Sequence, residues 1–98
     1  MFSHVVVFRF KPGTSDQQVD AIERGLAGLP ARLPDMRSYT YGRDLGIRDG
    51  NCDFAVVAEF DDEAAWLVYQ RDEEHRRVIE QLIVPVTAER HAVQLRHP

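Results

Sequence analysis

Two segments of the chain, Ser3–Phe10 and Phe54–Phe60, carry apolar side chains at both odd and even positions. Side chains alternate between the two faces of a strand. In the first segment, Val5 and Val7 therefore lie on one face, and His4, Val6, Phe8 and Phe10 lie on the other. In the second, Ala55 and Val57 lie on one face, and Phe54, Val56, Ala58 and Phe60 lie on the other. Because a strand that is apolar on both faces needs cover on both, these two strands are predicted to occupy the centre of a sheet.

Helical patterns lie between and after these strands. Thr14, followed three residues later by Gln17, matches a capping box and predicts a helix start there. The helix is supported by apolar residues at helical spacing, namely Val19, Ile22, Leu26 and Leu29. Further helices are expected over Ala64–Tyr69 and from about Glu74 to Val84, where Pro85 ends the pattern.

The remaining segments complete the order βαββαβ. Ser38–Arg43 and Arg90–Arg96 alternate as half-exposed strands, and Asp44–Asp53 is expected to be a long hairpin loop. This order predicts an α+β, ferredoxin-like fold with a four-stranded antiparallel sheet in the spatial order 4-1-3-2. The two doubly apolar strands then lie in the centre, and residues 1–98 are expected to form a single domain.

The helices of such a fold cover one face of the sheet and leave the other apolar face exposed. An exposed apolar surface of that size marks an interface. We therefore expect two subunits to pack sheet to sheet as a two-fold homodimer with the form of an α/β barrel.

Composition excludes several classes of partner. The net charge is -4 and the pI is about 5.5, which argues against nucleic acid as a partner. No apolar stretch approaches the roughly 20 residues needed to cross a bilayer, so no membrane partner is expected. Cys52 is the only cysteine and Met1–Arg9 lacks the features of a secretion leader, so a soluble, cytoplasmic protein is predicted. No metal-ligand spacing or glycine-rich phosphate loop is present, so no cofactor is predicted.

Three stretches carry a family resemblance. His4–Thr14 resembles the opening of stress-responsive dimeric α/β-barrel (Dabb) domains, with a histidine, a valine-rich strand and a Lys-Pro-Gly turn. Asp53–Asp62 resembles the third strand of that family, and Tyr69–His75 resembles the segment after the second helix. The family includes stress-related plant proteins, dimeric proteins without a known activity, and a plant olivetolic acid cyclase.

The resemblance to the cyclase implies His4, Tyr69 and His75 as pocket-lining catalytic residues. The family pattern His-Pro-x-His is replaced by Asp72-Glu73-Glu74-His75 in this chain. A histidine near neutral pKa can take a proton from a carbon acid, and a tyrosine can donate to the carbonyl that becomes an enolate. Because Tyr69 and His75 are six residues apart, they converge only if the chain bends near Arg71–Glu73.

Each of these residues also has a simpler structural interpretation. Tyr69 can be a core residue with a satisfied hydroxyl, His75 a helix-start residue, and His4 a buried, hydrogen-bonded strand residue. Asp72 and Glu74 lie beside His75 in the sequence and are expected to raise its pKa by favouring the charged form. His91 and His97 are expected at the surface.

Three functional hypotheses follow. The first is a homodimer that binds a small, largely apolar molecule in a pocket between helices and sheet. The second is a cofactor-free cyclase or lyase that performs intramolecular aldol chemistry, with His75 as base and Tyr69 as carbonyl donor. The third is a purely structural dimer. Related dimeric ferredoxin-like families include monooxygenases and isomerases that act on aromatic compounds, so an oxygenase-like role is a further alternative.

Overall fold

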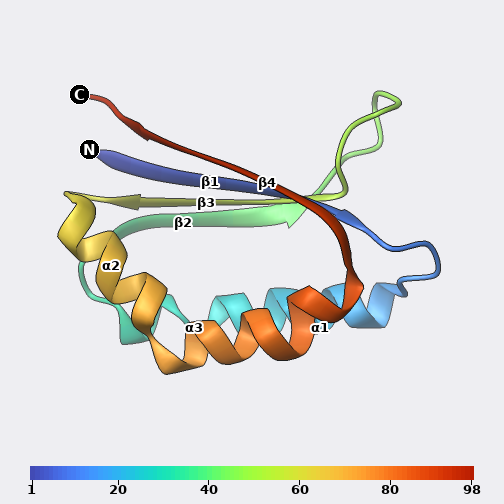
Figure 1. Cartoon of the computed structure of the whole chain (residues 1–98), viewed down its shortest axis with the longest axis horizontal. Helices are drawn as coiled ribbons and strands as arrows, with labels where there is room; N and C mark the ends of the chain where they lie inside the picture. Colours follow the sequence, from blue (N-terminus) through green and yellow to red (C-terminus); the bar gives the residue numbers. More distant parts are fainter.

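The computed structural model describes residues 1–98, which form one antiparallel sheet and three α-helices (Figure 1). The elements in chain order are β1 (Phe2–Phe10), α1 (Asp16–Ala27), β2 (Met36–Arg43), β3 (Phe54–Phe60), α2 (Glu63–Arg71), α3 (Glu73–Val78) and β4 (Thr87–Arg96). The strand order is β2-β3-β1-β4, so the predicted ferredoxin-like topology is confirmed, with β1 and β3 in the centre. No helix combines the length and apolar character needed to span a membrane.

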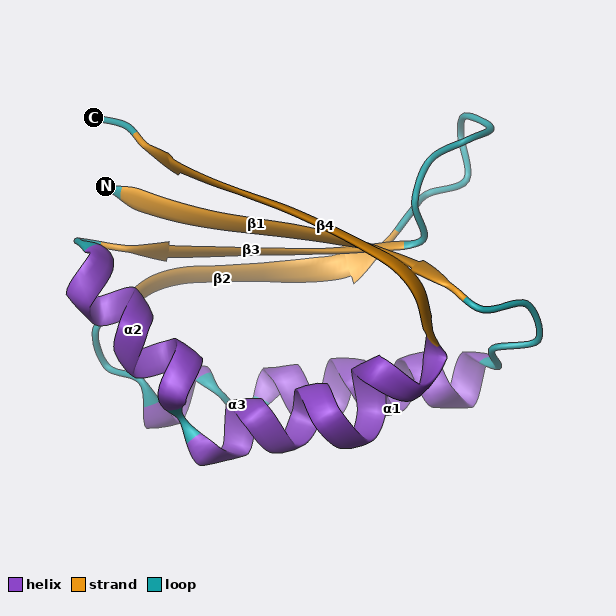
Figure 2. Ribbon diagram, in the orientation of Figure 1, coloured by secondary structure: helices purple, strands orange, loops and turns teal.

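The molecule has two layers, with all helices on one face of the sheet (Figure 2). Side chains of β1 and β3 at alternate positions point toward the helices and are buried there, among them Val6, Phe8, Val56, Ala58 and Phe60. The helical side of this core is formed by residues such as Val19, Ile22, Leu26, Val78 and Ile83. The apolar stripe predicted for α1 is therefore the stripe that covers the sheet.

The start of α1 lies one residue beyond the predicted position. Ser15, not Thr14, is the N-cap, and its hydroxyl accepts the backbone N–H of Gln18 at 3.1 Å. The side chain of Gln18 accepts the backbone N–H of Ser15 in return, at 2.8 Å. The hydroxyl of Thr14 instead donates to the carbonyl of Lys11 in the preceding turn, at 2.7 Å. Both Thr14 and Ser15 have glutamine three residues later, so the capping pattern alone fits two starts.

Helices α1 and α3 approach closely at Gly25. A Cβ atom placed on Gly25 would lie 3.0 Å from Cγ2 of Val78 and 3.2 Å from Cδ1 of Leu82. Because that separation is shorter than ordinary packing contacts, a side chain at this position would require the side chains of Val78 and Leu82 to shift. The missing side chain at Gly25 thus lets α1 and α3 pack closely side by side.

The helical segment predicted for Glu74–Val84 changes form along its length. It begins as α3, continues as a π-helical turn over Ile79–Ile83, and ends in a 3₁₀ turn over Val84–Val86. Pro85 within that turn lacks an N–H and cannot extend α-helical hydrogen bonding. The hydroxyl of Thr87 donates to the carbonyl of Ile83 at 2.7 Å and thereby caps the segment. Strand β4 starts there, three residues earlier than predicted, and rises from the helix layer to the sheet (Figure 1).

The second face of the sheet has no covering element. Val5, Val7, Ala55 and Val57 lie on it in the centre, and Val93 and Leu95 of β4 lie on it at the edge, 56% and 44% exposed. The loop between β2 and β3 rises on this side of the sheet (Figure 1) and carries the exposed side chains of Leu45 and Ile47. An apolar surface therefore extends from the sheet onto the loop.

Candidate functional site

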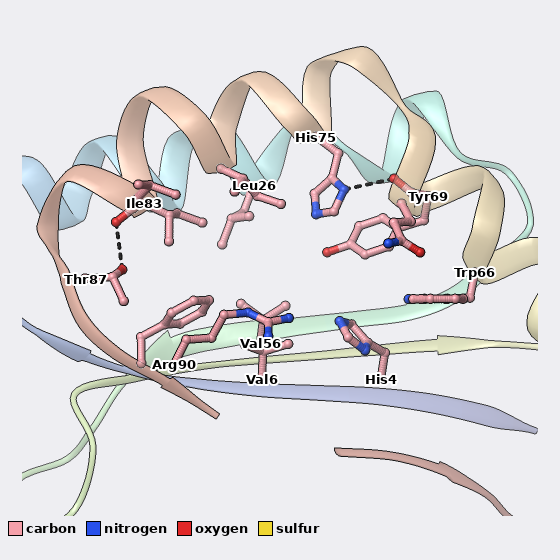
Figure 3. A pocket seen from close by; sticks show the side chains of 14 residues that line it. His4, Val6, Leu26, Val56, Trp66, Tyr69, His75, Ile83, Thr87 and Arg90 are labelled. Atoms are coloured by element: carbon pink, nitrogen blue, oxygen red, sulfur yellow. Dashed lines mark hydrogen bonds between the residues drawn. The ribbon is translucent and has the colours of Figure 1, made fainter. Parts of the chain in front are cut away.

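A cavity of about 200 Å³ lies between the sheet and the helices. Its apolar wall comes from both layers and includes Val6, Phe8, Leu26, Val56, Ile79 and Ile83. Its polar groups include the three residues predicted from the sequence, His4, Tyr69 and His75, which line this one cavity (Figure 3). His4 points into it from β1, and Tyr69 and His75 point into it from the helices.

A bend at Asp72 brings Tyr69 and His75 together. Helix α2 ends at Arg71, Asp72 is extended with φ -62° and ψ 131°, and α3 starts at Glu73. The carboxylate of Asp72 accepts the backbone N–H of His75 at 2.9 Å, as an N-cap does. The rings of Tyr69 and His75 then stack with centroids 3.8 Å apart. The bend expected between these residues is therefore present.

A backbone contact defines the tautomer of His75. Nδ1 lies 2.9 Å from the carbonyl oxygen of Tyr69. A carbonyl oxygen can only accept, so Nδ1 carries the hydrogen and neutral His75 has its lone pair on Nε2. Nε2 points into the cavity (Figure 3) and has no hydrogen bond to the protein. It is not among the fully buried polar atoms, so a molecule in the cavity can reach it. The cavity therefore contains one accessible imidazole acceptor.

The pKa of His75 shifts in the direction opposite to the prediction. Burial lowers it, because the imidazolium form loses its hydration when the side chain is only 7% exposed. The Tyr69 carbonyl and Asp72 favour the charged form but have smaller effects. The guanidinium of Arg32 lies 3.0 Å from the carboxylate of Asp72, and its positive charge offsets part of the effect of Asp72 on His75. His75 is a neutral base near pH 7.

His4 has the complementary tautomer. The side-chain amide of Gln94 in β4 donates to Nδ1 of His4 at 3.0 Å, so neutral His4 carries its hydrogen on Nε2. Burial lowers the pKa of His4 to about 4, and the nearby charge of Arg90 adds to the shift. His4 is thus buried and hydrogen-bonded, as its structural interpretation expects, and it also lines the cavity.

The hydroxyl of Tyr69 is paired with that of Tyr39 in β2. The two oxygens are 3.0 Å apart, and Tyr69 is 3% exposed. Burial raises the pKa of Tyr69 to about 12 and raises that of Tyr39 further, so both are protonated at neutral pH. Each hydroxyl has one hydrogen, and only one of the two hydrogens is used in the bond between them. If Tyr39 donates, the hydrogen of Tyr69 is free for a molecule in the cavity.

Arg90 is a lining residue that sequence reasoning did not identify. It lies in β4 opposite Phe8 of β1, and its side chain extends over Val6 and Val56 toward His4 (Figure 3). The alternation of side chains along the strand could have indicated it, because Arg90 and Gln94 are an even number of residues apart and lie on the same face of β4. Its reach into the cavity also depends on the ascent of β4 from the helix layer, which no local pattern shows.

The other reactive residue types lie elsewhere. His91 is exposed beside Glu89, and Nε2 of His97 lies 2.7 Å from the hydroxyl of Ser3, close to Glu59. Cys52 lies in the loop after β2. No group of three or more His, Cys, Asp and Glu side chains is arranged to hold a metal ion.

The fold and the cavity define a class of protein, a small ferredoxin-like α+β domain with polar groups facing an interior space between sheet and helices. The chain belongs to the Dabb family, whose stress-responsive A/B barrel domain matches residues 2–96. No curated protein matches the sequence.

Solved structures share this fold. A dimeric ferredoxin-like protein of unknown function from Thermobifida fusca is 38% identical, with a TM-score of 0.89 over 96% of this chain and 88% of that chain. A hydroxynitrile lyase from Passiflora edulis is 21% identical, with a TM-score of 0.81 over 96% and 90%. A Dabb family protein from Mesorhizobium loti is 16% identical, with a TM-score of 0.80 over 99% and 96%. The last two likenesses concern the fold.

Proposed function

We propose that this protein is a homodimer that binds a small, largely apolar molecule in the cavity between sheet and helices. The observation that carries the proposal is the wall of that cavity, in which apolar side chains surround the ring nitrogens of His4 and His75. Binding sites for small molecules typically combine an apolar lining with a few placed polar groups. The apolar part supplies affinity, and the two histidines and Tyr69 orient the molecule.

The volume of the cavity limits the size of its ligand. An engineered apolar cavity of about 150 Å³ takes up benzene, so a space of about 200 Å³ suits a single ring with a short substituent. The two histidines offer opposite hydrogen-bonding roles, since Nε2 of His75 accepts and Nε2 of His4 donates. A ligand with a hydroxyl group next to its ring can use both, whereas a carbonyl group can only accept from His4.

The dimer is supported by the uncovered face of the sheet. Val93 and Leu95 are largely exposed there, beside the apolar centre of β1 and β3. Packing this face against a second copy removes apolar surface from water at roughly 25 cal/mol per Å². The Thermobifida fusca relative is described as dimeric. The loop bearing Leu45 and Ile47 rises toward the space that a second sheet would occupy.

Calorimetric titration with 2-phenylethanol tests the binding site. The neutral ring fits the apolar wall, and its hydroxyl can reach a histidine. Val84 lines the cavity and is 57% exposed, so Val84→Trp narrows the space without replacing a core residue. The matched control is Val68→Trp on α2, which is 56% exposed and outside the cavity. We expect Val84→Trp to weaken binding at least tenfold and Val68→Trp to leave it unchanged. Equal effects, or no binding to the wild-type protein, would refute the site.

The accessible lone pair of His75 favours a second candidate, a cofactor-free cyclase or lyase. In that reaction Nε2 of His75 removes a proton from the carbon next to a carbonyl, while the hydroxyl of Tyr69 donates to the carbonyl oxygen as it becomes an enolate. The enolate carbon then forms a bond to a second carbonyl of the same molecule. The imidazolium returns its proton to the new alkoxide, so the reaction is redox-neutral.

Solvent exchange tests this chemistry without knowledge of the substrate. Phenylacetone has an acidic carbon next to its carbonyl, and NMR in D₂O follows its exchange. The wild-type protein is expected to accelerate exchange, and His75→Gln and Tyr69→Phe are expected to remove the acceleration. His91→Gln is the control, because His91 is exposed and outside the cavity. If His75→Gln retains full acceleration, His75 is not the base.

A further inference from the structure

The cavity has an unbalanced charge. Arg90 is the only lining residue that is charged at neutral pH, because the cavity contains no aspartate or glutamate and both lining histidines have lowered pKa values. A single cation beside apolar walls attracts an anion more strongly than the same cation in open water, since the low local dielectric strengthens the attraction.

No carboxylate of the protein neutralises Arg90. It makes no ion pair and no side-chain hydrogen bond, unlike Arg32, Arg37, Arg43 and Arg77, which all have carboxylate partners. The adjacent Glu89 is directed elsewhere, 3.9 Å from Arg9 and 3.2 Å from His91. Because alternate residues of a strand point to opposite faces, Glu89 lies on the face of β4 that points away from the cavity. The guanidinium is therefore free to bind a ligand.

We propose that Arg90 binds the carboxylate of a small acid whose remaining part is apolar or aromatic. The proposal rests on the cavity being a ligand site and adds the chemical class of the ligand. The planar guanidinium matches a carboxylate with two parallel hydrogen bonds. The apolar part of the acid lies against Val6 and Val56, over which the Arg90 side chain extends.

The position of the charge supports this arrangement. The guanidinium of Arg90 extends toward His4 at the polar end of the cavity (Figure 3), and its charge acts to lower the pKa of both His4 and Tyr69. A carboxylate at Arg90 places the rest of a short acid between the sheet and the helices, in the cavity that His75 also lines.

Paired ligands of equal size test the proposal. Phenylacetate and 2-phenylethanol share a ring and chain length, and they differ in charge. Titration of the wild-type protein is expected to show tighter binding of phenylacetate, with an affinity that falls as salt is added. In Arg90→Gln the ratio of the two affinities should fall about tenfold. This is the lower end of the effect of a charged hydrogen bond, because the Arg90 side chain is exposed. Arg90→Lys should retain part of the preference for phenylacetate.

Arg96→Gln is the matched control. Arg96 lies on the same strand, is exposed and is outside the cavity, so its loss should leave the ratio unchanged. If the wild-type protein binds 2-phenylethanol as well as phenylacetate, or if Arg90→Gln leaves the ratio unchanged, the carboxylate proposal is wrong and the apolar site stands. If neither compound binds, the site itself fails.

Discussion

The imidazole ring of His75 stacks on the phenol ring of Tyr69, with centroids 3.8 Å apart and planes inclined by 26°. The same histidine bonds through Nδ1 to the backbone carbonyl of Tyr69 at 2.9 Å. These two contacts fix the position, the rotation and the tautomer of His75. The residues are six positions apart in different helices, and they form one unit at the cavity because the chain bends between them.

The cap at Asp72 should control the orientation of His75. Asp72→Ala removes the N-cap of α3 and the partner of Arg32, so the free energy of unfolding should fall by about 1–2 kcal/mol. The control is Asp62→Ala, which removes the N-cap of α2. Both variants should lose stability in denaturant titrations, but only Asp72→Ala should move the ring signals of His75 in NMR spectra. Unmoved His75 signals in Asp72→Ala would show that the stack alone orients the ring.

The hydroxyls of Tyr39 and Tyr69 should depend on each other for stability. Tyr39→Phe and Tyr69→Phe each leave one partly buried hydroxyl without its partner, at a cost of about 1 kcal/mol. The double variant leaves none unpaired, so it should be about 1 kcal/mol more stable than the sum of the single losses implies. Urea unfolding of the three variants measures this coupling. Strictly additive losses would mean that the two hydroxyls do not bond in solution.

The lowered pKa of His4 links stability to pH. His4 titrates at about 4 in the folded protein and near 6.5 when unfolded, so between these values the unfolded chain binds more protons. Stability from His4 is therefore complete above pH 6.5 and lost as the pH falls toward 4. Over this pH range the free energy of unfolding should fall by about 2 kcal/mol. This is less than the full pKa shift of His4 implies, because solvent near the cavity mouth weakens the effect. His4→Gln should flatten this part of the curve of unfolding free energy against pH, and an unchanged slope would contradict the assignment.

The open sheet face should be the dimer interface. Val93→Asp places a carboxylate where the proposed sheet-to-sheet packing excludes water, so it should shift the protein from dimer to monomer in sedimentation equilibrium. Val84→Asp is the control, because Val84 is equally exposed but lies on the helical side. A monomeric wild-type protein, or a dimer that both variants preserve, would place the interface elsewhere or remove it.

The fold could be predicted largely from the alternation of side chains between the two faces of each strand. Ser3–Phe10 and Phe54–Phe60 are apolar at both parities, and the sheet has β1 and β3 in its centre. Boundaries were less predictable where two neighbouring residues satisfy the same rule. Thr14 and Ser15 both precede a glutamine at the capping spacing, and the turn at Lys11 decides between them by using the hydroxyl of Thr14.

The site could be predicted only in part. A strand-face pattern places His4 on the helical side, but the approach of Tyr69 to His75 depends on the backbone of Asp72. The direction of the His75 pKa shift was wrong because sequence shows the acidic neighbours but not the burial that outweighs them. Arg90 was missed because its place in the cavity depends on how β4 leaves the helix layer.

The most direct test of the ligand site uses the four histidines of the chain. NMR spectra of the histidine rings can be followed while 2-phenylethanol is added. We expect the signals of His4 and His75, which line the cavity, to shift along one saturable curve, and those of His91 and His97, which lie outside it, to stay in place. Shifts distributed evenly over all four histidines, or no shift at saturating concentration, would contradict the proposal that this cavity binds a small apolar molecule.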